Sequence, residues 1–308
     1  MIWLLLLLAL FPNAVTGQNI SAKPKRVPLE RVNIILKSPI KYERRIIGQD
    51  PRTGQSLYYD PKPRVIVLDA KAKKYGLRWI GYDHKEKTII YQRPDAVDVV
   101  VSVSVSRVAG GQYLYVYDIM NLPTSMEYVS TFAVQNYSSK VTPIRSSQLH
   151  VGGITRNGRE FKAGNWIGFG VLSGDVTPGK HFEVKLLSSA PPGLVECRVA
   201  GVLGMKGVGE EPPQELENVL PGYEIWPHGY TLGPMDQLTS FSRRQRANYI
   251  RGSLPQIRRL GWAAPATIRW YEQNLDSYNL NEVAHRAAED FRLGKITSEL
   301  QDMIKLMD

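Results

Sequence analysis

Cysteine is almost absent from this chain: among its 308 residues there is one, Cys197. No disulfide can form within a single copy, so noncovalent packing alone must hold the fold. Cys197 lies in LVECRV, where apolar and polar residues alternate as they do in a strand. We therefore expect a small buried hydrophobic side chain, because a catalytic thiol would need a positioned histidine that no local motif supplies.

Histidine is also scarce, and none of the five stands in an HExxH motif or in a Cys/His zinc spacing. His285 and Glu289 lie four residues apart on an expected helix, but both fall on its polar face, which favours a solvated pair. The stretch FGVLSGD at 169–175 lacks the spacing of a GxSxG elbow, and the glycines of 201–209 lack the Gly-Lys-Ser/Thr ending of a phosphate loop. We expect no metal site, no cofactor and no catalytic residue.

Long apolar runs are limited to one, the ten residues Ile2 to Phe11. This run is too short to span a bilayer, which needs roughly 20 residues, and is typical of the core of a signal peptide. Small residues follow at Val15 and Gly17, so we predict a signal peptide over 1–17, although no Lys or Arg precedes the run. A buried N-terminal strand or helix is the alternative. The mature chain should then be exported, periplasmic or extracellular, without a transmembrane segment.

Positive charge dominates, with a net charge of +10, but it is uneven. Residues 18–93 hold 18 Lys and Arg against 7 Asp and Glu, and residues 237–308 hold 11 against 8. Residues 205–236 reverse the balance, with 1 against 6. Such asymmetry indicates either an anionic partner or docking of the basic ends on the acidic stretch.

Short stretches of alternating apolar and polar residues dominate the middle of the chain. In VDVVVSVSVSRV (97–108) valines alternate with Asp98, Ser102 and Ser104, as in a half-buried strand. Similar strands are expected at 64–70, 75–82, 88–92, 112–121, 127–137, 165–172, 181–189 and 193–201. Their turn spacing predicts a mainly β fold with an antiparallel Ig-like β-sandwich over 61–204. A basic extended arm (18–60) should precede it.

A Gly/Pro-rich acidic linker is expected over 205–235, lying on the sandwich with Trp226 and Tyr230 as anchors. The apolar period becomes helical after it, which predicts a small α-helical region over 236–308. Pro265 suits a first helical position, Asn279 with Glu282 resembles a capping box, and Gly294 suits a helix end. The expected apolar faces hold Val283, Ala284, Ala287, Ala288 and Phe291, and then Leu300, Met303, Ile304 and Met307.

The stretch SFSRRQRANYIRGSLPQIRRLGW (240–262) holds six arginines and no acidic residue. On a helical wheel with Leu238, Phe241 and Tyr249 on one face, most arginines fall opposite, and Ile250 is the misfit. A solvated helix face is the favoured interpretation. Docking on an anionic envelope polymer or lipid is the alternative. Nucleic acid is an unlikely partner, because the aromatics are not interleaved as base-stacking platforms and the chain is expected to be exported.

The segments YLYVYDIMNLPTS, EYVSTFAVQN and NWIGFGVLSGDVTPGKHFEVKLLSSAPPG resemble uncharacterised exported bacterial β-sandwich proteins. In these a Tyr-rich strand leads to an Asn-x-Pro-x-Ser turn, and a later Pro-Gly turn precedes a hydrophobic strand. The resemblance covers 75–204 and implies the architecture alone.

Taken together, the patterns predict an exported, non-enzymatic binding or structural protein of the bacterial cell envelope that contacts a protein or a glycan. Its candidate contact residues are Tyr113, Tyr115, Tyr117, Trp166 and Trp226, for each of which core packing is the preferred role. A charge-driven envelope-attachment module is the alternative, through Arg243, Arg244, Arg246, Arg258 and Arg259. A cell-wall or matrix polymer hydrolase is less favoured, because no local spacing brings two carboxylates together.

Overall fold

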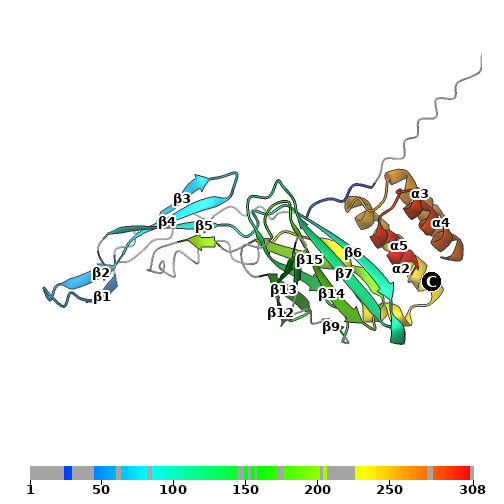
Figure 1. Cartoon of the computed structure of the whole chain (residues 1–308), viewed down its shortest axis with the longest axis horizontal. Helices are drawn as coiled ribbons and strands as arrows, with labels where there is room; N and C mark the ends of the chain where they lie inside the picture. The colour runs from blue at the N-terminus through cyan, green and yellow to red at the C-terminus, as the bar shows by residue number, and fades with distance from the viewer. Residues whose placement is uncertain are drawn as a thin grey trace, which may run out of the picture.

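The computed structural model shows an elongated molecule with a β-arm, a central sandwich and a helical end (Figure 1). It describes residues 24–29, 45–59, 64–81, 83, 85–139, 141–143, 149–151, 154–156, 158–171, 176–201, 204–206, 226–275 and 280–305. The predicted signal peptide lies outside these residues. Within them, no helix is long and apolar enough to cross a membrane.

Two antiparallel sheets form the sandwich, which confirms the predicted mainly β fold. The first has the order β11-β10-β14-β7-β6, with β9 also paired to β14, and the second has the order β12-β13-β8-β15-β17. Strands of the first sheet are β6 (Val99–Arg107), β7 (Tyr113–Asn121), β9 (Val141–Pro143), β10 (Leu149–Val151), β11 (Ile154–Arg156) and β14 (His181–Ser188). Strands of the second are β8 (Val129–Gln135), β12 (Gly158–Ala163), β13 (Trp166–Val171), β15 (Pro192–Gly201) and β17 (His228–Pro234).

The inner faces of these sheets interdigitate into one core, as their period-2 alternation predicts. Tyr115 and Tyr117 on β7 are fully buried, and the Tyr117 ring lies 5.2 Å from that of Phe132 on β8. Cys197 is also fully buried, and burial raises the pKa of its thiol. The expected role of Cys197 as a small hydrophobic residue matches this position.

The β-arm of Figure 1 is larger than the predicted arm over 18–60 and forms sheets of its own, separate from those of the sandwich. From here on, the arm means these sheets. Its four-stranded sheet has the order β16-β5-β4-β3, and a further hairpin pairs β1 with β2. The strands are β1 (Arg45–Gln49), β2 (Ser56–Tyr59), β3 (Arg64–Asp69), β4 (Lys74–Ile80), β5 (Glu86–Gln92) and β16 (Gly204–Lys206). The strands expected at 64–92 are therefore present but belong to the arm and not to the sandwich. Local periodicity detects a strand without showing which sheet it joins.

A buried ion cluster joins the arm to the sandwich. Arg93 donates from Nε and Nη2 to both oxygens of Asp95, at 2.8 and 2.9 Å, and Lys73 also pairs with Asp95. The Asp95 carboxylate is fully buried, and Arg93 is 4% exposed. Each buried charge in the cluster therefore has a partner of opposite sign, and Lys73, from the β3–β4 turn, is tied to the segment that leads from β5 to β6.

Strand β17 corrects the predicted linker, whose last residues belong to the second sheet. Gly229 and Gly233 made this stretch look like a loop, yet both glycines are required by close packing. A Cβ atom on Gly233 would lie 2.5 Å from Val195 Cγ2, and one on Gly229 would lie 2.7 Å from Leu29 Cδ2. Gly229 thus packs against the N-terminal segment and Gly233 against a side chain of the neighbouring strand β15, and sequence patterns cannot distinguish such glycines from those of a turn.

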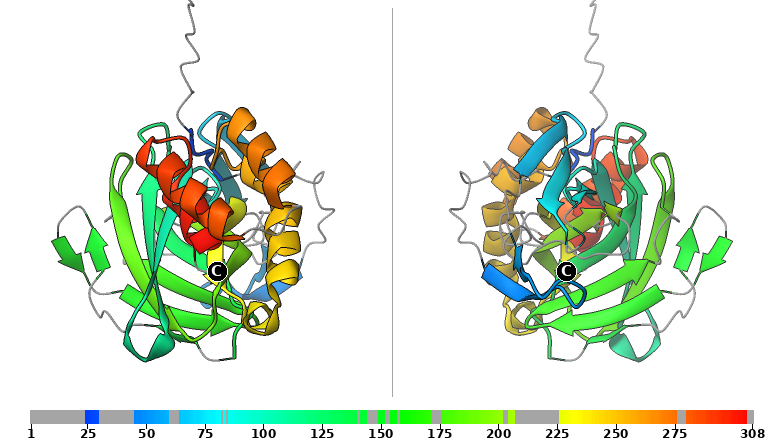
Figure 2. Two further views of the ribbon diagram at one scale, coloured as in Figure 1. Left: turned by 90° about the vertical axis from the view of Figure 1, so that its right-hand side faces the viewer. Right: turned by 90° about the vertical axis from the view of Figure 1, so that its left-hand side faces the viewer.

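Four helices gather at the end of the molecule opposite the arm (Figures 1 and 2). They are α2 (Arg243–Arg259), α3 (Pro265–Asn274), α4 (Leu280–Arg292) and α5 (Ser298–Lys305), and a 3₁₀ helix η3 (Asp236–Ser240) precedes them. A shorter 3₁₀ turn, η1 (Ala109–Gly111), connects β6 to β7. Pro265 begins α3 and Gly294 follows α4 with φ +66°, as expected. Asn279, the expected cap of α4, and Met307 lie outside the described residues.

The predicted wheel of the arginine helix was wrong in phase. Leu238 and Phe241 precede α2, which begins after a Ser242–Gln245 capping box. The buried stripe instead contains Ala247, Leu254, Ile257 and Ile250, the supposed misfit. On α4, Phe291 is likewise 42% exposed and outside the packed face. The first error arises because that wheel began at Leu238, before the helix starts, whereas the residues expected on the α4 face all lie inside that helix and Phe291 is exposed in its last turn.

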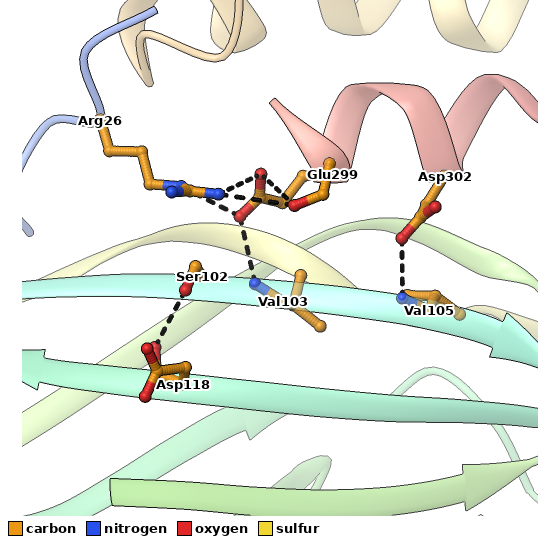
Figure 3. Close-up of polar contacts among 8 residues, drawn as sticks. Arg26, Ser102, Val103, Val105, Asp118, Glu299 and Asp302 are labelled. Carbon is orange, nitrogen blue, oxygen red and sulfur yellow. Dashed lines mark hydrogen bonds and ion pairs between the residues drawn. The ribbon is translucent and has the colours of Figure 1, made fainter. Parts of the chain in front are cut away.

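The helical end also covers the open side of the sandwich. Edge strands β6 and β17 of the two sheets lie next to one another on this side. Figure 3 shows α5 facing β6: Glu299 Oε1 accepts from the Val103 N–H at 3.1 Å, and Asp302 Oδ2 accepts from the Val105 N–H at 2.8 Å. Two helix carboxylates thus occupy the hydrogen-bonding edge of β6, which would otherwise be free to pair with another chain.

The N-terminal segment 24–29 completes this cover, lying between sandwich and helices (Figures 1 and 2). The Leu29 N–H donates to Val99 O at 2.9 Å and the Val27 N–H donates to Leu260 O at 3.3 Å. Arg26 binds both carboxylate oxygens of Glu299, at 3.2 and 3.1 Å. The segment therefore ties β6, α2 and α5 together.

Replacing Asp302 by Asn is expected to stabilise the protein near pH 7.5. Burial is the main cause that raises the pKa of Asp302 from 3.8 to about 6, partly offset by the Val105 N–H. A carboxyl group whose folded pKa is raised contributes stability below its unfolded pKa and loses it as pH rises through the folded value. After discounting for partial exposure, the gain at pH 7.5 should be about 1–2 kcal/mol and should vanish near pH 4. The measurement is urea unfolding of the unaltered chain and of Asp302→Asn between pH 4 and pH 7.5. If the free energy of unfolding depends on pH equally in the two proteins, the prediction is wrong.

Candidate functional site

The outer face of the second sheet carries a row of larger side chains across four strands. Trp166 on β13 pairs with Gln135 on β8, and Glu196 on β15 pairs with Tyr230 on β17. The register that pairs Cys197 with Val134 places Glu196 opposite Gln135, and the Glu196 N–H donates to Gln135 Oε1 at 3.4 Å. Opposite residues of antiparallel strands share a face, so Trp166, Gln135, Glu196 and Tyr230 form one cross-strand row.

Each member of the cross-strand row is half-buried, so its side chain presents part of its surface to solvent. Neighbouring strands lie about 4.8 Å apart, so Trp166 and Tyr230 stand about 14 Å apart, with an amide and a carboxylate between them. The row therefore combines an aromatic surface at each end with polar groups at its centre.

Arg198 reinforces the Trp166 end of the row. Its guanidinium carbon lies 4.4 Å from the centroid of the Trp166 ring, in a cation–π arrangement, and its Nη2 lies 3.8 Å from Glu196 Oε2. Gly168 and Ala133, which pair in the next position on this face, are small, and Arg198, the partner of Ala133 on β15, reaches across them to the ring. The ring is therefore held by a contact on its own sheet, and Arg198 covers part of its surface.

Two hollows open at the Tyr230 end of the row, and both are lined by Glu196 and Tyr230. The first, of about 260 Å³, lies against the helices and the N-terminal segment, and includes His228, Arg259 and Trp262. The second, of about 440 Å³, lies along the sheet face and includes Gln135, Tyr137, Leu194 and Gln237. Both hollows thus adjoin the Glu196–Tyr230 half of the row, whereas Trp166 lines neither of them.

Glu196 is the only carboxylate among the described residues that line these two hollows. The pair of facing carboxylates used by most glycoside hydrolases is thus not formed by those residues. Across the described part of the chain, no group of three or more His, Cys, Asp and Glu residues is placed to hold a metal ion.

The candidate aromatic residues fall into two groups. Tyr115 and Tyr117 are fully buried, and Tyr113 is 6% exposed, so all three serve in the core, the role that the sequence favoured. Burial raises the pKa values of Tyr115 and Tyr117 well above the usual value, and their hydroxyls donate to Ala190 O and Leu232 O. Trp166 stands in the cross-strand row. Trp226 is half-buried and lies two residues before β17 begins.

The candidate arginines do not form one patch. Arg243 donates to Asn281 Oδ1 at 2.5 Å, and Arg258 lies 3.7 Å from Glu272, so two of them connect α2 to neighbouring helices. Arg244 is exposed on α2. Arg259 lines the hollow beside the helices, and Arg246 lines a different hollow at the other end of α2.

Sequence reasoning missed Gln135 and Glu196, and it named Tyr230 only as an anchor of the supposed linker. The alternation of GLVECRVAG does place Glu196 and Arg198 on the outer face of a strand. What it cannot show is that β17 pairs with β15, because that pairing joins residues thirty or more positions apart. The four residues of the row are brought together by the order and register of the strands, which the sequence pattern does not give.

Comparison with known proteins adds little. No family model and no curated protein matches the sequence. Among solved structures, the chain is similar to ChBD3 from Thermococcus kodakarensis KOD1, at 17% identity and a TM-score of 0.23, covering 37% of this chain and 92% of that one. It is also similar to the chitin-binding domain of a Pyrococcus furiosus chitinase, at 14% identity and a TM-score of 0.21, covering 46% and 96%. A third is BcpA, the major pilin subunit of Bacillus cereus, at 11% identity and a TM-score of 0.23, covering 50% and 58%. TM-scores this low carry no information about function.

Proposed function

We propose that this protein is exported and binds an extended carbohydrate chain of the cell envelope along the cross-strand row, without catalysing a reaction. The observation that carries the proposal is the composition of the row: a half-buried aromatic at each end, and an amide and a carboxylate between them. Sugar rings offer apolar C–H faces to aromatic side chains and hydroxyls to polar ones, so a row of this kind suits an oligosaccharide.

The setting of the row supports binding in three ways. It lies on regular strands of a sheet, which hold side chains more rigidly than loops do. The Arg198–Trp166 contact fixes the indole before a ligand arrives, which lowers the entropic cost of binding. The two hollows at the Tyr230 end leave room for the chain to continue.

Charge-driven attachment through the arginines of α2 is the second candidate, because these residues lie on or near the helical surface. The two modes differ in their response to salt. Attachment to a polyanion weakens steeply as ionic strength rises, whereas stacking on Trp166 and Tyr230 should persist.

Trp166→Ala and Tyr230→Ala should each weaken carbohydrate binding about tenfold, the loss expected for one stacking contact. The measurement is co-sedimentation of the mature chain with insoluble peptidoglycan, cellulose and chitin, at 50 mM and 500 mM NaCl. Retention that survives at high salt and falls in both variants is the expected result.

Phe291→Ala is the matched control, because Phe291 is an exposed aromatic on α4, far along the chain from the row. It should bind as the unaltered chain does. Retention that disappears at high salt and is unaffected by the two row variants would replace the proposal with charge-driven attachment. If the chain is retained on none of these polymers, the proposal that it binds carbohydrate is wrong.

A further inference from the structure

Strand β3 forms one edge of the four-stranded arm sheet, and its outer side has no partner strand among the described residues. The sheet order is β16-β5-β4-β3, and of the described strands only β4 pairs with β3. The helices that cover β6 lie at the opposite end of the molecule from the arm (Figure 1). An edge strand that is neither paired nor covered offers its outward N–H and C=O groups to a further strand.

The sequence of β3, RVIVLD, favours pairing with another strand. Its four central residues are apolar, and three of them are β-branched. Val67 is 57% exposed and Leu68 is 48% exposed, which makes Val67 the most exposed of the large hydrophobic side chains that the structure describes. An exposed, apolar edge strand of this kind is a site where another chain adds a strand.

The small apolar cluster of the arm ends at this edge. Tyr91, Tyr75 and Val67 hold opposite positions on β5, β4 and β3, and opposite residues share one face of a sheet. Tyr91 and Tyr75 are buried, whereas Val67 is exposed. Val65, two residues earlier on β3, packs against the same cluster. This apolar face is therefore buried on β4 and β5 and open to solvent at β3.

A second copy of β3 fits this edge in an antiparallel register with a twofold axis. Leu68 has no partner on β4 and forms a bulge, so β3 has five register positions, of which Ile66 holds the middle one. Two antiparallel strands related by a twofold axis pair around one residue that faces its own copy. With Ile66 at the centre, each end of the paired strands sets the Arg64 position opposite the Asp69 position of the other copy. Pairs of opposite charge on neighbouring strands favour this register.

From this pattern we propose that two copies of the protein associate through β3, joining their arm sheets into one. The pairing places Val67 opposite Val65 of the other copy, so the apolar row from Tyr91 through Tyr75 continues into the second arm. It also satisfies the outward backbone groups of both strands. Because a single strand pair buries little area, we expect a weak, concentration-dependent dimer. The cross-strand row lies on a sandwich sheet, so this inference does not rest on the proposed function.

The first test is sedimentation equilibrium of the full mature chain over a wide range of concentrations. We expect a reversible monomer–dimer equilibrium, which Val67→Lys should weaken at least about tenfold, because it places a charge in the apolar row. Met126→Lys is the matched control, since Met126 is 45% exposed in the loop between β7 and β8. A chain that stays monomeric up to about 1 mM, a Val67→Lys variant that associates as the unaltered chain does, or equal loss in both variants would overturn the proposal.

An exchange of charges tests the register. Arg64→Glu sets two acidic residues opposite one another at each end of the paired strands, and Asp69→Lys sets two basic ones, so each variant alone should associate about tenfold more weakly. An equimolar mixture restores opposite charges at both ends of a mixed dimer and should associate about as strongly as the unaltered chain. Because Asp69 also accepts from the Ala72 N–H at 2.9 Å, a variant that only disturbs the arm would gain nothing from mixing. A mixture no stronger than either variant would show the register to be wrong.

Ile66→Cys reports on the twofold axis directly. Paired Cα atoms at the axis would lie about 5 Å apart, within the range of a disulfide. Under mild oxidation this variant should form a covalent dimer, and Thr88→Cys, at an exposed position on β5, should not. The native Cys197 is fully buried and does not compete. Equal crosslinking of the two variants, or none in Ile66→Cys, would contradict the proposal. Val67→Lys should leave carbohydrate retention unchanged, so the two proposals fail or succeed separately.

Discussion

Replacing Asp95 by Ala should destabilise the protein by about 3–5 kcal/mol, the largest effect that we expect from a single substitution. Asp95 is fully buried and is the shared partner of Arg93 and Lys73. Its removal would leave two cations without their carboxylate at the joint between arm and sandwich, and a buried charge that has lost its partner is costly. Urea unfolding of the two chains measures the difference.

The joint should also loosen locally in this variant. In limited proteolysis of this variant, the arm strands β3 to β5 should be cleaved before the sandwich. In the unaltered chain, the arm and the sandwich should be cleaved at similar rates. Asp83→Ala is the matched control, because Asp83 pairs with Lys87 at an exposed hairpin tip. It should leave both the unfolding midpoint and the cleavage pattern unchanged. A midpoint for Asp95→Ala equal to that of the control would show that the cluster does not hold the arm.

The second large effect concerns the cover of β6. Glu299→Ala should cost about 3 kcal/mol or more, because it removes the acceptor for the Val103 N–H and the buried partner of Arg26 at once. Hydrogen exchange at the Val103 amide should accelerate far more than at amides in the middle of β7. The amide of Val105, held by Asp302, should accelerate as well if α5 leaves as a unit.

Two further variants separate the loss of the hydrogen-bond acceptor from the loss of the negative charge at Glu299. Glu299→Gln keeps an acceptor oxygen but removes the charge, so it should retain most of the Val103 protection while weakening the contact with Arg26. Glu289→Ala removes an exposed carboxylate from α4 and should change neither amide. Unaltered exchange at Val103 in Glu299→Ala would mean that α5 does not protect the edge strand.

Such a cover solves a problem that a sandwich with free edges would face. An edge strand with unpaired N–H groups is a template for aggregation, and proteins block it with charges, bulges or a covering element. Here the covering element is a helix whose carboxylates act as the acceptors of a missing strand, and segment 24–29 supplies a backbone donor and a cation. The chain therefore uses its two ends to close the side of its centre.

How far the sequence could predict this structure depends on the range of the interactions. Alternation of valines and serines in 97–108 and of tyrosines in 112–121 is a local signal, and both strands form as expected. The helix starts at Pro265 and after Ser242 are local too, although the second was recognised only in the structure. The contact between Glu299 and Val103 joins residues 196 positions apart, and no local pattern predicts it. A helical wheel assigns every charged residue to the solvent face, so it places Glu299 on the wrong side of α5.

The candidate site shows the same division. Trp166 could be identified from the sequence as an aromatic residue at the start of a strand. Its proposed role in binding depends on Gln135, Glu196 and Tyr230 lying in the same cross-strand row. Tyr230 was assigned to a linker because the stretch 205–235 is rich in glycine and proline, and Gly229 and Gly233 add to that composition. Their actual role is to let β17 approach Leu29 and Val195 closely, a tertiary requirement. Residue types are visible in the sequence, whereas the surface they form is set by strand order.

The most direct test of the carbohydrate site is an NMR titration of the isotope-labelled mature chain with soluble fragments of peptidoglycan, cellulose and chitin. The proposal predicts that one of these shifts the indole N–H of Trp166 and the amides of Gln135, Glu196 and Tyr230, with saturation and with little change at 500 mM NaCl. Shifts confined to α2 and the arm, or no saturable shift in the cross-strand row with any fragment, would contradict it.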